Sequence, residues 1–215
     1  RASEVGVPPL RFEASTAKKP RRRMRREPVV LGELYEGRIV ERGSVPTRLD
    51  DWHDFFNALA FLASPAAKWA LHARQYRLLA ARLEPRARRL PGARTREQDA
   101  LSLLDEVGIL VALAPERARA LPADVDAFQV ELATLLERGE ARAVPFGHAL
   151  FEHLVAGRDD MLGTMLVVPV CACEQMERAA LRAALDGALA ALLRDPTQFT
   201  EPSRARGIAL ARLAP

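Results

Sequence analysis

The stretch VPTRLDDWHDFFNAL, at positions 45–59, predicts the start of the first helix of this protein. Asp50 or Asp51 can cap that helix, because a carboxylate at the N-cap accepts hydrogen bonds from unpaired backbone amides. From Trp52 to Ala63 apolar residues recur at helical spacing. We expect three of them to anchor the helix in the core, namely Phe55, Phe56 and Leu59.

Outside this stretch the chain alternates between helical patterns and short apolar runs. The predicted helices cover residues 52–63, 65–83, 95–104, 124–137, 146–156 and 174–194, and the third opens with a capping box. Strands are predicted at 109–114 and 163–170, and residues 29–40 form either a short strand or an extended lead-in. About six helices with two or three short strands predict an α+β domain in which helices predominate.

The net charge of +4 is unevenly distributed along the chain. Residues 1–28 carry nine basic and three acidic side chains, a net charge of +6, so the remainder carries −2. Most of the excess lies in KKPRRRMRR, residues 18–26. We predict a flexible basic arm over 1–28 and a single globular domain over 29–215, with residues 18–26 able to bind nucleic acid or an acidic partner.

Several classes of protein are disfavoured by what the sequence lacks. No apolar run approaches the roughly 20 residues of a membrane-spanning helix, and the N-terminus shows no apolar signal region. Cys171 and Cys173 are too close to join without strain, which suits a reducing cytoplasm, and a zinc site there needs two further ligands. The missing glycine-rich phosphate loop, GxGxxG, HExxH and GxSxG patterns argue against nucleotide-driven, Rossmann, zincin and serine-hydrolase enzymes.

Four blocks of the chain resemble one known bacterial family, in the same order. The longest is VPTRxxxWHDFFNAL from Val45, and the others are PxxKxxLH from Pro65, DALxLLDExG from Asp99 and FGHALxE from Phe146. The family is a domain of unknown function, numbered three thousand and twenty-five. The resemblance implies one coherent domain and carries no activity to transfer. The family usually ends in a segment rich in proline and tryptophan, whereas the tail of this chain has no tryptophan.

The first block presents polar groups on an otherwise apolar helix. His53 and Asp54 lie in its first turn, where the helix dipole disfavours an imidazolium and keeps His53 neutral. A neutral imidazole is what a metal ligand or a general base requires. Asn57 follows on the same face as His53. The alternative is local, with Asp54 helping Asp51 to cap the helix.

Two further pairs supply imidazole or acidic groups. His148 and Glu152 are four residues apart on one helix face, a spacing that can hold a metal or let the glutamate orient the histidine. A plain hydrogen bond within the helix is the alternative. Asp105 and Glu106 lie in an expected turn before an apolar strand, as in many metal and acid–base sites. Such turns are equally common without a function.

Lys68 lies near the start of the second predicted helix, where the dipole disfavours a cation. We therefore expect a negative group beside it, either a carboxylate from another block or a bound anion such as phosphate. A surface lysine is the alternative. His72 lies one turn later and can share that face, while Arg48 and Asp99 are expected to form structural ion pairs.

Two functions follow from these residues. The first is a metal-dependent hydrolase, in which a divalent ion that activates water is bound by His53, Asp54, Asp105, Glu106, His148 and Glu152. Asn57 and Lys68 complete its catalytic set, and Lys68 or Arg48 holds an anionic, phosphoester-like substrate. The second is a non-catalytic binding or scaffold protein, with a buried polar network and a basic arm that contacts nucleic acid or an acidic partner. A separation of His53 and His148 beyond roughly 15 Å excludes the first, since one ion cannot bind both.

Overall fold

The computed structural model of the chain describes residues 9–15, 27–158, 162–201 and 206–209. These residues form eight α-helices, two short 3-10 helices and six strands. The strands are β1 (Arg11–Ser15), β2 (Ser44–Arg48), β3 (Gly108–Leu113), β4 (Ala141–Pro145), β5 (Leu162–Pro169) and β6 (Arg206–Ala209). The helices are η1 (Leu31–Glu33), α1 (Tyr35–Arg42), α2 (Trp52–Ala63), α3 (Pro65–Ala80), α4 (Arg96–Val107), α5 (Pro115–Ala120), α6 (Val125–Glu137), α7 (His148–Val155), η2 (Cys173–Gln175) and α8 (Arg178–Arg194). The predicted α+β class with predominant helices is confirmed, but the predicted numbers of helices and strands are too low.

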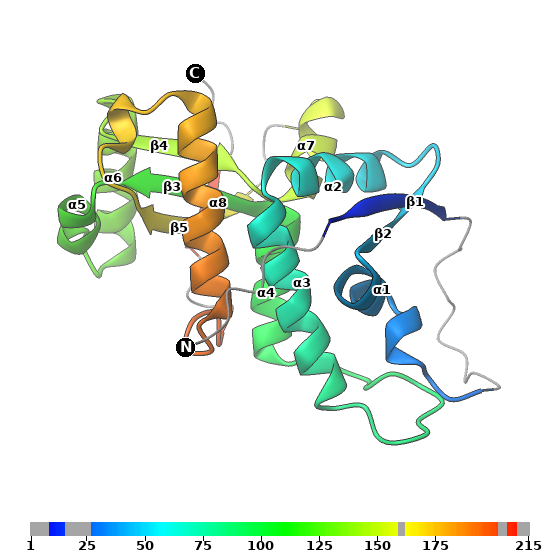
Figure 1. The fold of residues 1–215 in the computed structure, drawn as a ribbon. Helices are drawn as coiled ribbons and strands as arrows, with labels where there is room; N and C mark the ends of the chain where they lie inside the picture. Colours follow the sequence, from blue (N-terminus) through cyan, green and yellow to red (C-terminus); the bar gives the residue numbers. More distant parts are fainter. Residues whose placement is uncertain (1–8, 16–26, 159–161, 202–205, 210–215) are drawn as a thin grey trace.

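Strand β3 lies at the centre of the larger sheet, whose order is β4-β3-β5-β6. It pairs antiparallel with β4 and parallel with β5, and β6 is antiparallel to β5. All six residues of β3 are buried, as expected for a strand that is covered on both faces. Figure 1 shows α8 across one side of this sheet, with α5 and α6 at its far end.

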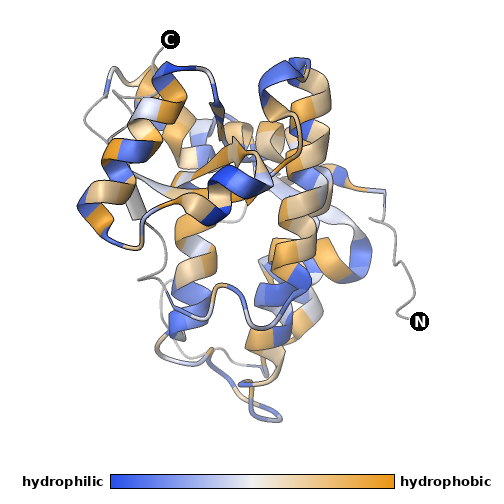
Figure 2. Cartoon of the chain, turned by 90° about the vertical axis from the view of Figure 1, so that its left-hand side faces the viewer, coloured by the Kyte–Doolittle hydropathy of each residue, from blue (hydrophilic) through white to orange (hydrophobic). Residues whose placement is uncertain are grey.

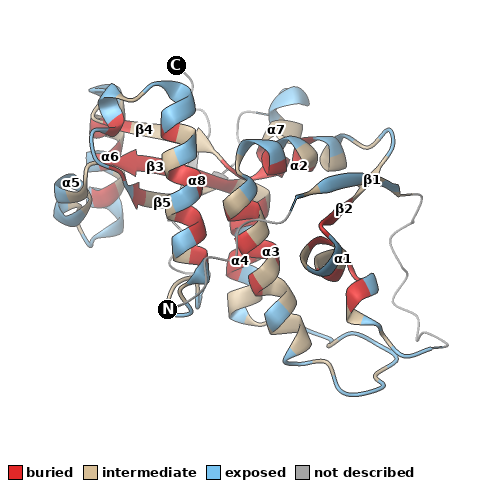
Figure 3. Cartoon of the chain, viewed as in Figure 1, coloured by how far each residue is buried: buried red, intermediate tan, exposed pale blue. Residues whose placement is uncertain are grey.

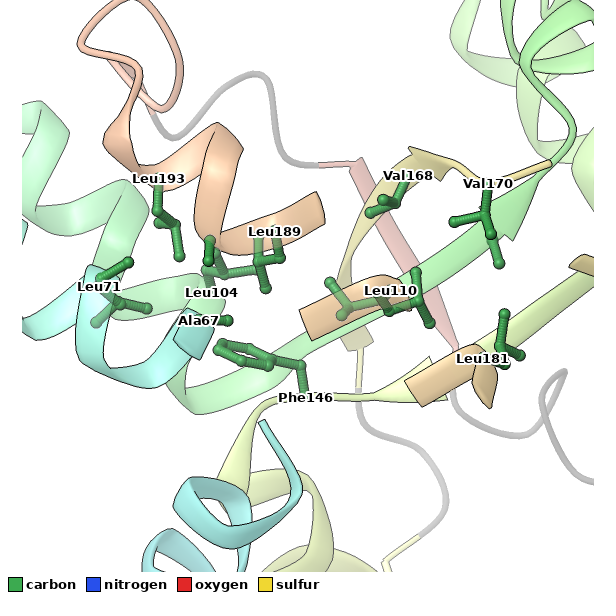
Figure 4. Packing of buried hydrophobic residues seen from close by; sticks show 14 of the residues in the cluster. Ala67, Leu71, Leu104, Leu110, Phe146, Val168, Val170, Leu181, Leu189 and Leu193 are labelled. Atoms are coloured by element: carbon green, nitrogen blue, oxygen red, sulfur yellow. The ribbon is translucent and has the colours of Figure 1, made fainter. Parts of the chain in front are cut away.

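One face of this sheet forms the larger core with three helices. Leu110 and Ala112 of β3 and Val168 of β5 pack with apolar residues of α3, α4 and α8. Figure 4 shows these side chains gathered in one cluster with Phe146, which precedes α7. This cluster fixes α3 beside α4, and so fixes the polar residues that the two helices carry on their other sides.

The opposite face of the sheet packs against α6 and α7. Ile109, Val111 and Leu113 alternate along β3 with the residues of the first face, and they share a second cluster with Leu132 of α6 and Leu150 of α7. The burial colours of Figure 3 follow this arrangement, with β3 buried along its length and the helices around the sheet buried on one side. Figure 2 shows the matching pattern of hydropathy on the helices.

A second, two-stranded sheet lies beside α1. Strand β1 runs parallel to β2, with Ser15 opposite Arg48. Because β1 falls within segment 1–28, residues 11–15 of the predicted arm belong to the fold, while the basic run 18–26 lies outside the described residues. The prediction of a strand or extended lead-in over 29–40 is wrong, since η1 and α1 occupy it. Helix α1 ends at Gly43, whose φ of 63° is a conformation that glycine adopts without strain.

Helix α2 covers the residues predicted for it, but its predicted anchors are only partly right. Phe56 is buried, whereas Phe55 and Leu59 are 48 % and 44 % exposed, so the prediction that these two lie in the core is wrong. The inner side of α2 is anchored instead by Phe61, which packs with Ile39 and Val45 in a small separate core. Among the described residues, no helix combines the length and the apolar character needed to cross a membrane.

Candidate metal centre

His53 reaches the candidate site from the first turn of α2. The helix is capped as predicted, because the Asp51 carboxylate accepts a hydrogen bond from the backbone amide of Asp54 at 3.1 Å. About a third of the His53 side chain is exposed, and its Nδ1 lies 3.4 Å from a carboxylate oxygen of Glu152 on α7. That oxygen can accept the Nδ1 proton, which leaves Nε2 of a neutral His53 with an unshared electron pair.

His148 is the first residue of α7 and is buried. The chain reaches it through Gly147, where a Cβ would lie only 2.4 Å from the backbone nitrogen of Gly108, so a larger residue would push α7 away from α4 and β3. Nδ1 of His148 lies 2.8 Å from the backbone carbonyl oxygen of Asp105. A carbonyl oxygen only accepts, so Nδ1 must carry the proton and donate it. Nε2 of the neutral ring therefore carries the electron pair.

The two imidazoles meet at their Nε2 atoms. These atoms are 3.2 Å apart, and the ring centroids are 4.4 Å apart. Glu106, in the last turn of α4, places a carboxylate oxygen 3.5 Å from Nε2 of His148. The ligand atoms of all three residues lie within 4.8 Å of one another. Three of the four blocks singled out in the sequence thus converge, and His53 and His148 pass the distance test for a shared ion.

The spacing of these atoms matches what one metal ion requires. Two electron pairs that face each other at 3.2 Å repel unless a proton or a cation lies between them. Two nitrogen ligands of one tetrahedral zinc ion, each at about 2.0–2.1 Å from it, are about 3.3 Å apart. The nearby Glu106 carboxylate adds negative charge, which favours a cation in that position.

Burial shifts the pKa values of His148 and Glu106. It lowers the pKa of His148 to about 4, while the Asp105 carboxylate opposes this shift and the charge of Lys68 adds to it. His148 is therefore neutral near pH 7, as a metal ligand must be. Burial also raises the pKa of Glu106, and the adjacent Asp105 carboxylate makes a smaller contribution in the same direction. A divalent ion at this position would favour the charged form of Glu106 and offset that cost.

A buried polar network lies behind the two histidines. The Lys68 side chain has no exposed surface, and its Nζ donates to Asp105 at 2.5 Å and to Asn57 at 2.7 Å. Asn57 in turn donates to the Tyr35 hydroxyl oxygen at 2.6 Å. Burial alone would raise the pKa of Asp105, but the Lys68 ammonium and the neighbouring histidines bring it down to about 2. The negative partner expected for Lys68 is therefore a carboxylate from another block.

Other predicted site residues have different partners. The Arg48 guanidinium donates to both Asp54 oxygens at 2.9 and 2.7 Å, and the Arg48 amide donates to the same carboxylate, so Asp54 is paired with Arg48 and is not among the three residues whose ligand atoms gather at the candidate site. Burial would raise the pKa of Asp54, but these bonds lower it. Glu152 contacts His53 of the neighbouring helix, in place of the predicted contact within its own helix to His148.

Two residues of this region were missed by sequence reasoning or left unassigned. Tyr35 holds Asn57, but it falls in a segment predicted to be extended. His72 is buried, stacks on Phe61 at a centroid distance of 5.3 Å and meets Tyr35 edge-on at 5.4 Å. Neither ring nitrogen of His72 has a hydrogen-bond partner among the described residues, and burial lowers its pKa to about 3. One turn from Lys68, it lies between the aromatic rings of Phe61 and Tyr35 and outside the hydrogen-bonded network.

Comparison with known protein families identifies one that covers most of the chain. A family model described as "Protein of unknown function (DUF3025)" matches residues 24–210, which include His53, Glu106, His148 and the network behind them. No curated protein and no solved structure matches the chain. Since the family model covers most of its length, the chain belongs to the DUF3025 family of proteins of unknown function.

Proposed function

We propose that this protein is a metal-dependent hydrolase whose divalent ion is bound by His53, Glu106 and His148. The observation that carries the proposal is the 3.2 Å separation of the two Nε2 atoms, while Nδ1 of His148 is committed to the Asp105 carbonyl. Metal-binding histidines in proteins nearly always have such a partner on the second nitrogen. Two histidines and one glutamate are also a ligand set of catalytic zinc sites, which keep a fourth position for water.

The ion would supply the nucleophile. A zinc-bound water has a pKa of about 7, so hydroxide forms near neutral pH. Glu152 and the Asp105 carbonyl orient the two imidazoles, and about half of the Glu106 side chain and a third of the His53 side chain are exposed. A substrate would therefore approach from the side of His53 and Glu106, because His148 is covered.

The identity of the substrate depends on which cation faces the site. Lys68 and Arg48, first considered for an anionic substrate, both bind carboxylates of the chain itself. Arg94, exposed in the loop before α4, is near enough for its charge to favour the ionised forms of Glu36 and Glu106. We assign to Arg94 the contact with an anionic, phosphoester-like substrate, and to the network of Asn57, Lys68 and Asp105 the positioning of the helices.

A second candidate is a non-catalytic binding or scaffold protein, and the buried network favours it. Asn57, Lys68 and Asp105 satisfy one another's hydrogen bonds, so a packing role accounts for them without any reaction. In that case a bound ion stabilises the junction of α2, α4 and α7, and nothing is hydrolysed.

Thermal unfolding and hydrolysis, measured together, separate these candidates. The protein is stripped with EDTA and then given Zn²⁺, Mn²⁺ or Mg²⁺. We expect one of these ions to raise Tm and to support hydrolysis of bis(p-nitrophenyl) phosphate. His148→Ala should lose both effects, and His153→Gln, on the same helix, should keep both. A gain in Tm without hydrolysis supports the second candidate, and no gain with any ion contradicts the metal site.

A further inference from the structure

One side of α2 is apolar and exposed over three turns. Trp52, Phe55, Leu59 and Leu62 are all exposed, Trp52 and Leu62 by about two thirds (64 % and 67 %), and they share one side of the helix. Leu49, directly before the helix, is 75 % exposed. We call these five residues the α2 face. A continuous apolar strip in contact with water marks an interaction surface, whereas isolated exposed apolar residues do not.

The α2 face is distinct from the sides of the helix that pack inside the protein. Phe56 stacks on Phe151 of α7 at 5.9 Å, and Phe61 fills the small core with Ile39 and Val45. Trp52 stacks on Phe56 at 5.8 Å, so the outer rings rest on a buried aromatic layer. The strip is therefore held in place by the fold and remains outside it.

The charge expected of a partner follows from the basic run that comes directly after β1. Ser15, the last residue of β1, is opposite Arg48, and Leu49 of the α2 face follows Arg48 directly. The next eleven residues, 16–26, contain seven basic and no acidic side chains. The chain passes from Ser15, beside the start of the α2 face, directly into this basic run. Positive charge is thus attached at the start of the α2 face.

The acidic groups at the start of α2 offset only part of this charge, because Asp50, Asp51 and Asp54 against Arg48 give a net charge of −2, beside +7 for residues 16–26. Asp51 and Asp54 both form ion pairs with Arg48, at 2.8 and 2.7 Å. A partner that accepts an apolar strip and seven positive charges must itself offer an apolar layer beneath a negative surface. Duplex nucleic acid would engage the charge and leave the strip in water. A second copy of the chain would cover the strip and bring two basic runs together.

We propose that the α2 face docks on the surface of a lipid bilayer that contains anionic lipids. Tryptophan and phenylalanine favour the boundary between headgroups and acyl chains, where an amphipathic helix lies in the plane of the membrane. A basic run adds attraction to anionic headgroups, and two such contributions together give binding that neither gives alone. The proposal does not depend on the metal site.

Co-sedimentation of the full chain with vesicles tests this inference. We expect binding to vesicles that contain phosphatidylserine and little binding to phosphatidylcholine alone, with affinity falling as salt rises. Phe55→Gln and Leu62→Gln should each weaken binding about tenfold, since each removes one apolar side chain from the lipid. Val130→Gln is the matched control, because Val130 on α6 is as exposed as Leu62 (67 %). His148→Ala should bind like the native protein, which separates this test from that of the proposed function.

Several outcomes would overturn the inference. One is the absence of binding to anionic vesicles. Another is binding that Leu62→Gln leaves unchanged but that the triple variant Arg21→Gln, Arg22→Gln and Arg23→Gln abolishes, because charge alone would then account for the binding. A dimer in sedimentation velocity that Leu62→Gln dissociates would assign the α2 face to a second copy. Binding to duplex DNA that Phe55→Gln weakens would assign it to nucleic acid.

Discussion

Replacing Lys68 with methionine tests whether the buried ion pair holds α2, α3 and α4 together. The Lys68 side chain has no exposed surface, and that of Asp105 is 12 % exposed. Methionine has a similar length and no charge, so the change leaves the Asp105 carboxylate without its ammonium and the Asn57 carbonyl without its donor. The backbone of Asp105, which binds His148, is not altered.

The magnitude follows from the burial of the pair. Removing one partner of a buried ion pair typically costs about 3–5 kcal/mol, because the other charge stays buried and unpaired. The lowered pKa of Asp105 gives a free energy of similar size, since the fall from 3.8 to about 2 corresponds to about 2 kcal/mol. A depressed native pKa gives stability that is fully present above the unfolded value of 3.8 and is lost as pH falls through 2.

Urea denaturation followed by circular dichroism measures the effect. We expect Lys68→Met to lower the free energy of unfolding by about 3–5 kcal/mol near pH 7 and by less near pH 4, where the unpaired Asp105 takes up a proton. The double variant Lys68→Met with Asp105→Leu, which removes both charges, should recover most of the loss. A loss below about 1 kcal/mol, the value of an exposed pair, would refute this reasoning, as would an equal loss at both pH values.

Three further predictions concern residues around the site. His72→Phe should reduce the loss of stability on acidification by about 1.4 kcal/mol per pH unit between pH 6.5 and pH 3. The reason is that a histidine with a depressed native pKa destabilises the fold as the pH falls through this range, and urea denaturation at several pH values measures the slope. Asp186→Ala should lower the free energy of unfolding by about 1–2 kcal/mol in the same assay, since the Asp186 carboxylate accepts the first backbone amides of α3 at 2.7 and 3.1 Å. Gly147→Ala should displace His148 and weaken zinc binding at least tenfold by calorimetry, whereas Gly92→Ala, which meets open space, should leave it unchanged.

The parts of the fold predicted correctly from the sequence are those with local causes. The side chain of Asp51 caps α2, and the Thr95–Gln98 capping box opens α4, both within the bounds of a single turn. The apolar run that becomes β3 is buried on both faces and that of β5 is half-buried or buried over 163–168, so their apolar composition identifies both strands. Helix α1 was not recognised, because it is only eight residues long and contains Gly37, a poor helix former, although its apolar and polar residues lie on opposite sides.

Other errors arose where tertiary contacts decide the outcome. A helix that is apolar on two sides does not reveal which side is covered, and for α2 the buried side is that of Phe56 and Phe61, not that of Phe55 and Leu59. Glu106 was expected in a turn, but α4 continues to Val107, and this helical turn directs its carboxylate at His148.

The candidate site shows the same division. His53, Glu106 and His148 could be nominated from the sequence, because each is an ionisable group in an apolar context. The groups that orient the two histidines could not be identified from the sequence. Glu152 pairs with His53 only because α7 docks on α2, and the Asp105 carbonyl meets His148 only because α7 starts beside the end of α4.

The central claim is that His53 and His148 bind one metal ion, and zinc K-edge X-ray absorption tests it most directly. For the protein stripped of metal and given one equivalent of Zn²⁺, we predict two imidazole nitrogens at about 2.0–2.1 Å and no sulfur neighbour. His148→Ala should show one imidazole, and His153→Gln should show two. An unchanged imidazole count in His148→Ala, or sulfur at about 2.3 Å from Cys171 or Cys173, would contradict the assignment.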